Sequence, residues 1–279
     1  MSKKILITGE NSYVGSMFAE FTTEYGDVVD TIDMIGDDWK SGDFSSYDAV
    51  VHVAAIVHKQ ERKYSKQEYF KVNSELAFKV AQKAKNDGVK QFVFLSTMSV
   101  YGVLNGVITK DTPCVPFNLY GESKLKAEHI IRELDDENFT VTVLRPPIVY
   151  GKGCKGNYVV LSKFAKKLPL FPDYKSQHSM IYIDNLSAFI KKAIDERLSG
   201  VFCPQDDEYV CTADMVQKVA KANSKDIKLT RFFNPFIALA LKMKIHLVCK
   251  IFGTLIYEKD LCPPYDKVDF ETAIEKTET

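Results

Sequence analysis

A tyrosine and a lysine four residues apart, Tyr120 and Lys124, are the side chains of this sequence best suited to proton transfer. On a helix this spacing places both side chains on one face. An ammonium group beside a phenol favours the phenolate and lowers the tyrosine pKa from about 10 toward neutral pH. Such a phenol can exchange a proton with a hydroxyl or a ketone while hydride leaves or reaches the adjoining carbon. The pair therefore predicts oxidation or reduction at an alcohol carbon.

A second group of hydroxyl side chains strengthens this interpretation, because Tyr-x-x-x-Lys alone recurs by chance. Ser96-Thr97-Met98-Ser99-Val100-Tyr101-Gly102 follows directly on a strand expected at 91–95. A hydroxyl at the carboxyl end of that strand can hydrogen-bond the same reacting oxygen. We expect Tyr120 and Lys124 to act together with a hydroxyl of this segment.

A glycine-containing loop lies between the first expected strand, 5–7, and the first helix. Gly9 permits a tight turn, and Gly15 lets the helix pack closely on the sheet. The middle position, where glycine is usual, is Ser12, whose hydroxyl could donate to a phosphate. The N-terminus of a helix can bind a pyrophosphate through its backbone N–H groups. The sequence thus predicts a dinucleotide site at Gly9, Asn11, Ser12, Tyr13, Val14 and Gly15.

An aspartate ends the second expected strand, 27–32. A carboxylate at Asp33 can accept hydrogen bonds from both hydroxyls of an adenosine ribose and would repel a 2′-phosphate. The position favours NAD over NADP. A solvated turn aspartate is the alternative interpretation.

Short apolar runs alternate with stretches of helical period through the first half of the chain. Strands are expected at 5–7, 27–32, 48–53, 91–95 and 139–144, with helices between them, one beginning near Met17 and another covering 120–133. This alternation predicts an α/β fold of Rossmann type, with a doubly wound parallel sheet. We expect residues 1–150 to form the dinucleotide-binding domain, to which later strands could return, and 151–279 to form mainly a small mixed substrate-binding cap.

Composition limits the class of protein. The chain has 279 residues, 46% of them hydrophobic, with 37 basic and 37 acidic side chains, which argues against disorder and against a nucleic-acid partner. Six scattered cysteines form no C-x-x-C pair, and the five histidines show no metal-ligand spacing near them. We expect a cytoplasmic protein without a bound metal.

One apolar segment, 232–252, could suggest a membrane. Lysines interrupt it, and its longest uninterrupted apolar run, 235–241, is far shorter than the roughly 20 residues that span a bilayer. We expect ordinary packing helices rather than an amphipathic surface helix, and no membrane insertion.

Taken together, these motifs resemble the extended short-chain dehydrogenases/reductases of the NAD-dependent epimerase/dehydratase family, which act on nucleotide-sugars. Further matches are Asp43-Phe44, His52-Val53-Ala54-Ala55, Asn73 and Leu144-Arg145-Pro146-Pro147. The resemblance implies that Asp43 and Phe44 contact adenine and that Lys124 holds the nicotinamide ribose. It also implies that Val53, Ala54 and Ala55 line the cofactor channel, that Asn73 lies beside it and that Pro147 contacts the cofactor. Thr97 matches the catalytic Ser/Thr of the family, Tyr120 would be the acid/base, and Met98 and Ser99 would lie beside the substrate.

The second half is similar to bacterial surface-polysaccharide enzymes that act at C4 of UDP-sugars, through Lys155-Gly156-Asn157-Tyr158 and Ile181-Tyr182-Ile183-Asp184-Asn185. In that branch Asn157 would contact the diphosphate. His178 stands where an arginine often binds it. The resemblance implies an NAD-dependent UDP-hexose 4-epimerase, and a homodimer through a four-helix interface built from helices near 65–88 and 118–136. The alternatives are an NAD(P)H-dependent reductase of 4-keto sugars and a non-catalytic NAD-sensing scaffold.

Overall fold

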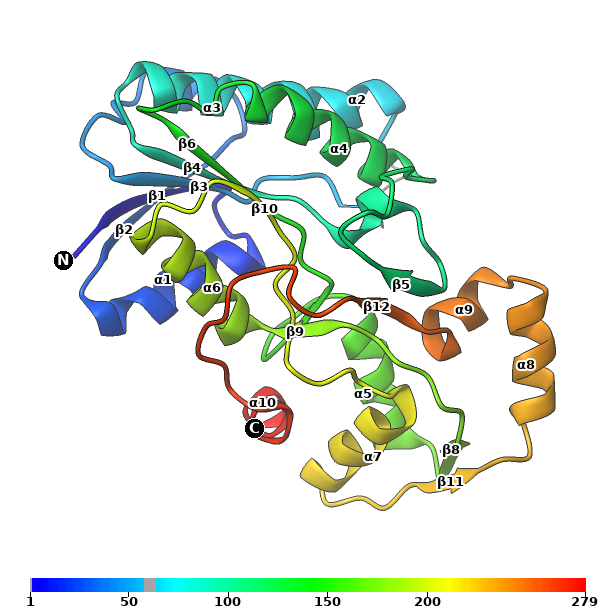
Figure 1. The fold of residues 1–279 in the computed structure, drawn as a ribbon. Coiled ribbons are helices and arrows are strands. Elements are labelled where there is room, and N and C mark those ends of the chain that lie inside the picture. Colours follow the sequence, from blue (N-terminus) through cyan, green and yellow to red (C-terminus); the bar gives the residue numbers. More distant parts are fainter. Residues whose placement is uncertain (1, 58–63) are drawn as a thin grey trace. The chain divides into compact units, whose positions relative to one another are not determined.

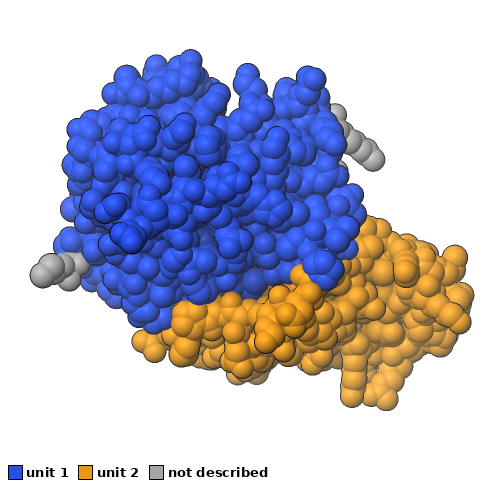
Figure 2. Space-filling view, turned by 45° about the horizontal axis from the view of Figure 1, so that its top comes forward, with its two compact units in different colours: residues 1–102, 113–146, 186–204 blue, residues 103–112, 147–185, 205–279 orange. Residues whose placement is uncertain are grey.

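The computed structural model describes residues 2–57 and 64–279. It consists of two compact units, coloured separately in Figure 2. The first unit comprises residues 1–102, 113–146 and 186–204, and the second comprises 103–112, 147–185 and 205–279. This division into units differs from the single boundary that the sequence suggested near residue 150, because residues 186–204 return to the first unit.

The first unit is built on a six-stranded parallel sheet (Figure 1). Its strands, in spatial order, are β2 (Val28–Ile32), β1 (Lys4–Thr8), β3 (Ala49–His52), β4 (Gln91–Leu95), β6 (Thr140–Leu144) and β10 (Gly200–Phe202). The chain runs from β1 to β2 on one side and then returns to pair β3 with β1 on the other. The strand order therefore reverses between β2 and β3, which flank β1, and such a switch point is where open α/β sheets bind ligands. The predicted doubly wound parallel sheet is confirmed.

The central strands are largely apolar because helices cover both faces of the sheet, and their few polar residues, such as His52, Gln91 and Thr142, are buried with them. Every residue of β3 is buried, as are Ile5, Leu6 and Ile7 of β1. In Figure 1, α1 (Tyr13–Thr22) and α6 (Ile183–Asp195) lie on one face of the sheet. The other face carries α2 (Lys66–Phe70), the π-helical turn η4 (Lys71–Leu76), α3 (Ala77–Asn86) and α4 (Leu119–Arg132).

Helix α1 begins at Tyr13, four residues before the start that the apolar pattern suggested at Met17. The earlier start has a local cause, since the Ser12 side chain caps the helix by accepting from the Gly15 N–H. Among its described residues the first unit also has three 3₁₀ turns, η1 (Thr23–Tyr25), η2 (Asp38–Lys40) and η5 (Met98–Tyr101).

The second unit contains three two-stranded parallel pairs and five helices among its described residues. The pairs are β5 (Gly106–Ile108) with β12 (Leu255–Tyr257), β7 (Ile148–Tyr150) with β9 (Met180–Tyr182), and β8 (Leu170–Pro172) with β11 (Lys228–Thr230). Helix α7 (Thr212–Ala222) packs against α5 (Asn157–Lys167) and α10 (Phe270–Glu278). Helices α8 (Asn234–Lys242) and α9 (His246–Phe252) contact each other.

The apolar segment 232–252 forms α8 and α9, which are short helices as expected. As ordinary packing helices they were expected to bury their apolar side chains, and this expectation is wrong for much of their surface. Ile237 and Cys249 are buried, whereas Phe232 and Phe236 are 72% and 66% exposed. Nowhere in the described chain is a helix both long enough and apolar enough to span a membrane.

Candidate active site

The loop between β1 and α1 has the shape of a phosphate cradle. Gly9 has φ 118°, and a Cβ on it would lie 2.8 Å from the backbone nitrogen of Ala54. A Cβ on Gly15 would lie 2.9 Å from Cγ2 of Ile7. Both positions thus require glycine, the first for its backbone conformation and both for close approach. This is the fit expected of a chain that receives a dinucleotide pyrophosphate.

Ser12 has a different role from the glycine that it replaces. Its Oγ accepts from the Gly15 N–H at 3.2 Å, so the serine fixes the helix start. The hydroxyl proton of Ser12 remains available to an anion. Asn11 before it adopts φ 59°, and Tyr13 and Val14 form the first turn of α1, where backbone N–H groups have no intrahelical acceptor.

Asp33 lies next to this loop. The Gly9 N–H donates to the carbonyl of Ile32 at 3.0 Å, which brings the end of β2 against the glycine turn. Asp33 is exposed, and its Oδ1 accepts from the N–H groups of Met34 and Ile35 at 2.7 and 3.2 Å. These bonds fix the carboxylate and leave Oδ2 to face a ribose, so the geometry suits the predicted role.

The two residues expected near adenine differ. Asp43 is exposed, and its hydrogen bonds with Ser45 lower its pKa, so it is ionised at neutral pH. The Phe44 side chain is 1% exposed and has the Lys83 ammonium over its ring, while its N–H donates to Asp87 at 3.0 Å. The position of Asp43 therefore suits the predicted contact with adenine. Contact of adenine with Phe44 stays a prediction, and the burial of the Phe44 side chain argues against it.

The segment after β3 forms one wall of the cradle. The N–H groups of Val53 and Ala54 both donate to the Thr8 carbonyl, at 3.1 and 3.0 Å, and Ala55 follows them. Asn73 of η4 is fully buried, and its side chain bonds the backbone of Ile56 in both directions, at 2.8 and 2.9 Å. Asn73 thus holds this wall in place.

Helix α4, which carries Tyr120, and the loop after β4, which carries Thr97, meet at these two residues. Thr97 caps η5, accepting from the Ser99 N–H at 3.2 Å and donating to the Ser99 hydroxyl at 3.3 Å. Burial raises the pKa of Tyr120 to about 12, and a hydrogen bond with Thr97 acts against this rise. The expectation that Lys124 lowers this pKa toward neutral pH is wrong for this structure, because burial of the phenol dominates and the lysine ammonium donates to the Leu95 carbonyl instead. The Met98 N–H donates to the carbonyl of Pro146 at 3.0 Å, which ties the loop to the end of β6. The predicted hydroxyl pair is thus in direct contact.

Lys124 lies beneath this pair on α4. Its Nζ donates to the carbonyl of Leu95, at the end of β4, at 2.7 Å and lies 4.5 Å from the centre of the Phe94 ring. Burial lowers its pKa to about 7, although the charge of Glu128 opposes that shift. A lysine poised between its charged and neutral forms at neutral pH is a feature of functional sites.

A buried ion pair below the site was not identified from the sequence as part of it. Both oxygens of Glu128 accept from Nε of Arg145 at 3.1 Å, and Nη2 of Arg145 lies 2.5 Å from Oε2. Burial disfavours the charged guanidinium, but the bonds and charge of Glu128 outweigh it and raise the pKa of Arg145. Ser96 donates to Glu128, and Arg145 donates to the hydroxyl of Tyr101 at 2.8 Å. No local sequence pattern signals this network, because it joins α4 to the residue that follows β6.

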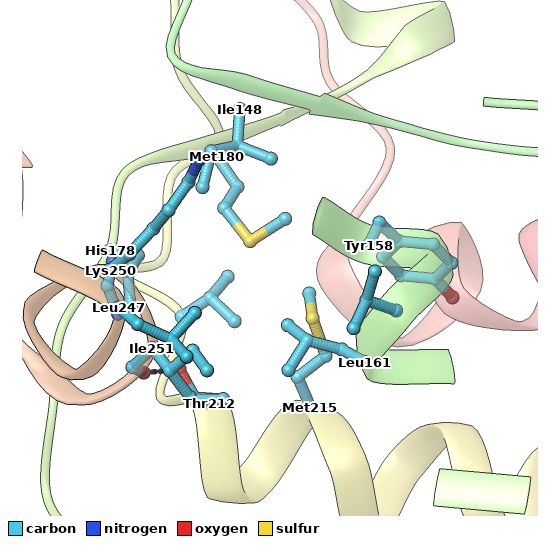
Figure 3. A pocket seen from close by; sticks show the side chains of 12 residues that line it. Ile148, Tyr158, Leu161, His178, Met180, Thr212, Met215, Leu247, Lys250 and Ile251 are labelled. Atoms are coloured by element: carbon cyan, nitrogen blue, oxygen red, sulfur yellow. Dashed lines mark hydrogen bonds between the residues drawn. The ribbon is translucent and has the colours of Figure 1, made fainter. Parts of the chain in front are cut away.

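Three predicted site residues belong to the second unit. Pro147 directly follows Pro146, whose carbonyl accepts from the Met98 N–H. Asn157 is the first residue of α5, and its side chain lies outside what the structure describes. His178 is buried. His178 lines a cavity of about 170 Å³, shown in Figure 3. Its Nε2 has no hydrogen-bond partner among the described residues. The remaining walls come from Ile148, Tyr158, Val160, Leu161, Met180, Val210, Thr212, Met215, Leu247, Lys250 and Ile251.

Comparisons with known proteins agree with this geometry. The model of the "NAD dependent epimerase/dehydratase family" matches residues 5–201. A UDP-glucose 4-epimerase of Vibrio cholerae is 31% identical over 81% of this chain and 77% of its own length. An N-acetyl-alpha-D-glucosaminyl-diphospho-ditrans,octacis-undecaprenol 4-epimerase of Escherichia coli O157:H7 is 29% identical over 72% of this chain and 66% of its own.

Solved structures share the fold. A UDP-glucuronic acid 4-epimerase from Bacillus cereus in complex with NAD superposes with a TM-score of 0.72 at 19% identity, covering 99% of this chain and 97% of the other. The matched segment 5–201 contains the glycine turn, Asp33 and the Thr97–Tyr120–Lys124 set. The chain therefore belongs to the NAD-dependent epimerase/dehydratase family and is an NAD-dependent enzyme of that family.

Proposed function

We propose that this enzyme is a 4-epimerase of UDP-hexoses that keeps NAD bound through its catalytic cycle. The observation that carries the proposal is the contact of Thr97 with Tyr120, with Lys124 one helical turn further along α4. The similarity to the Vibrio cholerae UDP-glucose 4-epimerase over most of both chains supports the choice of substrate class.

NAD would be held by the glycine turn, by the first turn of α1, by Asp33 at the ribose and by Lys124 on the nicotinamide side. When bound, it supplies a hydride acceptor that takes hydrogen from C4 of the sugar and gives it back. The exposed Asp33 carboxylate selects against a 2′-phosphate, which supports NAD over NADP.

Tyr120 exchanges the proton. Its phenol oxygen accepts the proton of the C4 hydroxyl as the carbon is oxidised, and returns it to the oxygen of the 4-keto sugar as the carbon is reduced from its other face. Thr97 hydrogen-bonds the same reacting oxygen and favours the phenolate. Lys124 makes no such contribution to the Tyr120 pKa in this structure, and we assign it to the nicotinamide ribose, with the desolvation of its ammonium limiting the charge that it carries at neutral pH.

The cavity of the second unit suits the nucleotide part of such a substrate. Its walls are mainly aliphatic, and its polar groups include the His178 ring, the Thr212 hydroxyl and the Lys250 ammonium. A buried imidazole nitrogen with no partner among the described residues gains a hydrogen bond when a polar ligand enters. Lys250 supplies a cation for a diphosphate (Figure 3).

We also infer a homodimer. Helices α2, η4, α3 and α4 form one layer on a face of the sheet, and the two copies of such a layer would make a four-helix interface. Phe70 lies on this layer, with the ammonium groups of Lys66 and Lys126 at 5.5 and 5.3 Å from the centre of its ring.

Two measurements test the function. Purified protein is denatured and the released dinucleotide is quantified, and native protein is supplied with UDP-glucose or UDP-galactose and no added cofactor. We expect close to one NAD per chain and interconversion of the two hexoses. Protein that releases no dinucleotide but consumes NADH or NADPH with a 4-keto sugar would instead be a reductase.

The variant Tyr120→Phe separates chemistry from binding. We expect it to retain the dinucleotide and to lose about three orders of magnitude in turnover, since general acid–base catalysis contributes about 10²–10⁴-fold. Tyr47→Phe is the matched control, because the Tyr47 hydroxyl bonds Asp30 away from the cradle. Full turnover in Tyr120→Phe would exclude the mechanism.

A further inference from the structure

The stretch 227–257 differs in charge from the rest of the chain. It contains Lys228, Arg231, Lys242, Lys244 and Lys250 and no aspartate or glutamate, within a chain whose basic and acidic residues are equal in number. Arg231 is paired with Asp173 at 2.9 Å. Lys242 and Lys244 are exposed and have no ion pair within the described part of the chain. The stretch is therefore a local source of positive potential.

An apolar stripe lies on the outer side of α8. Phe236 and Leu239 lie three residues apart on one face of α8, and Phe232 before the helix and Met243 at its C-cap extend the same spacing of four, three and four residues beyond its ends. They are 58–72% exposed, whereas Ile237 on the same helix is 8% exposed. A surface helix normally turns such a stripe toward the core. Here the apolar face is presented to the surroundings.

The turn into α9 extends this face. Lys244 adopts φ 54°, and the N–H of Ile245 donates to the carbonyl of Ala240 at 3.0 Å, so the chain reverses tightly after α8. Ile245 and Leu247 beyond the turn are 44% and 66% exposed. The hairpin of α8 and α9, drawn in orange in Figure 1, therefore combines exposed apolar side chains with three lysines, at 242, 244 and 250.

We propose that this hairpin, residues 232–250, docks on the surface of a bilayer that contains anionic lipids. Exposed aromatic and aliphatic side chains can enter the boundary between headgroups and acyl chains while lysines pair with lipid phosphates. Long lysine stems can lie along that apolar surface with their ammonium groups in water. Neither helix spans the membrane, so the attachment is peripheral and reversible.

Charge complementarity favours a lipid surface over a second copy of this chain. Two such hairpins packed face to face would bring together two segments that each carry Lys242, Lys244 and Lys250 and no acidic residue. Like charges brought together in this way oppose association. An anionic headgroup layer instead complements the lysines and accepts the apolar stripe at the same time.

The experiment is co-sedimentation of the full-length protein with sonicated vesicles. Vesicles of pure phosphatidylcholine are compared with vesicles of phosphatidylcholine and phosphatidylglycerol at about 70:30. We expect binding to the anionic vesicles and at least about tenfold weaker binding to the neutral ones. Binding should weaken by a similar factor when salt rises from about 0.05 to 0.5 M, because salt screens exposed charges.

Two double variants separate the contribution of the apolar side chains to vesicle binding from that of the lysines. Phe236→Ser with Leu239→Ser removes apolar contact, and Lys242→Glu with Lys244→Glu reverses two charges. Near an anionic surface each lysine contributes about fivefold, so the charge variant should bind at least about thirtyfold more weakly. Matched controls are Ile35→Ser, at a residue 84% exposed in the first unit, and Lys221→Glu at the end of α7. Both controls should bind as the unaltered chain does.

None of the four altered hairpin residues lines the cavity around His178, so turnover of a soluble UDP-sugar should be unchanged in both double variants. This separates failure of the docking proposal from failure of the proposed function. Equal binding to neutral and anionic vesicles, or no binding at low salt, would overturn the proposal. So would light scattering that shows a self-association lost on Phe236→Ser.

Discussion

The side-chain amide of Asn73 donates to the hydroxyl of Ser123 at 3.0 Å, joining two residues fifty positions apart. The same amide holds the backbone of Ile56, beyond the wall of the cofactor cradle. Ser123 lies one residue before Lys124 on the catalytic helix. One buried side chain thus links the cradle wall, the π-helical turn η4 and α4.

Replacing Asn73 should therefore destabilise the site as a whole. In Asn73→Leu the N–H and carbonyl of Ile56 lose their partner in the core, and the Ser123 hydroxyl keeps only its bond to the Tyr120 carbonyl. Each unsatisfied buried group costs roughly 1–3 kcal/mol. We expect the free energy of unfolding to fall by about 3 kcal/mol or more in urea titrations. Ser46→Ala, on the exposed partner of Lys4, is the control and should change it by less than about 0.5 kcal/mol. An Asn73→Leu protein as stable as the unaltered chain would contradict this linkage.

Lys124 should make stability depend on pH. Its pKa is about 7 in the folded chain and 10.5 ordinarily, so between these values the unfolded chain binds one proton more. Stability from this group therefore rises with pH through that window, by up to about 1.4 kcal/mol per pH unit. Urea titrations at pH 7, 8 and 9 should show a steeper rise for the unaltered chain than for Lys124→Met. Parallel profiles for the two proteins would refute the lowered pKa.

Lys124→Met should also abolish most turnover, because it removes the ammonium that we expect to position the nicotinamide ribose. The loss should be accompanied by weaker retention of the dinucleotide if the ammonium holds the nicotinamide ribose. Lys126→Met, two residues away and exposed, is the matched control for turnover. A Lys124→Met enzyme with unchanged turnover would remove this residue from the catalytic set.

The Glu128–Arg145 pair should be costly to break. Glu128→Ala leaves a buried guanidinium without its carboxylate, and breaking such pairs typically costs about 3–5 kcal/mol. The double variant Glu128→Leu with Arg145→Met removes both charges, and we expect it to recover much of the lost stability. The measurement is thermal unfolding of the unaltered chain and of the two variants. Equal losses of stability in both variants would contradict this expectation.

The dimer can be tested at Phe70, on the layer formed by α2, η4, α3 and α4. Phe70→Glu places a charge where two such layers would pack, so light scattering should show the mass falling from two chains to one. Phe164→Glu is the control on α5 of the second unit, at a residue 38% exposed. A monomeric unaltered chain at micromolar concentration would refute the interface.

The sequence alone predicted most of the sheet and the candidate catalytic pair. Buried parallel strands are short continuous apolar runs, so β1, β3, β4 and β6 could be recognised from local composition, and the more exposed β2 from the run of β-branched residues between turns. Gly9, Gly15 and the Tyr120–Lys124 spacing could also be identified, because turn geometry and helical period are local properties.

Other features depend on residues that are distant in the sequence. No local pattern indicates that Asn73 reaches Ser123, that Glu128 pairs with Arg145, or that Phe44 turns into the core. The return of residues 200–202 to the sheet as β10 is also a long-range pairing, with β6. The direction of the α8 stripe was likewise decided by tertiary structure, since helical spacing defines an apolar face but not what that face will contact.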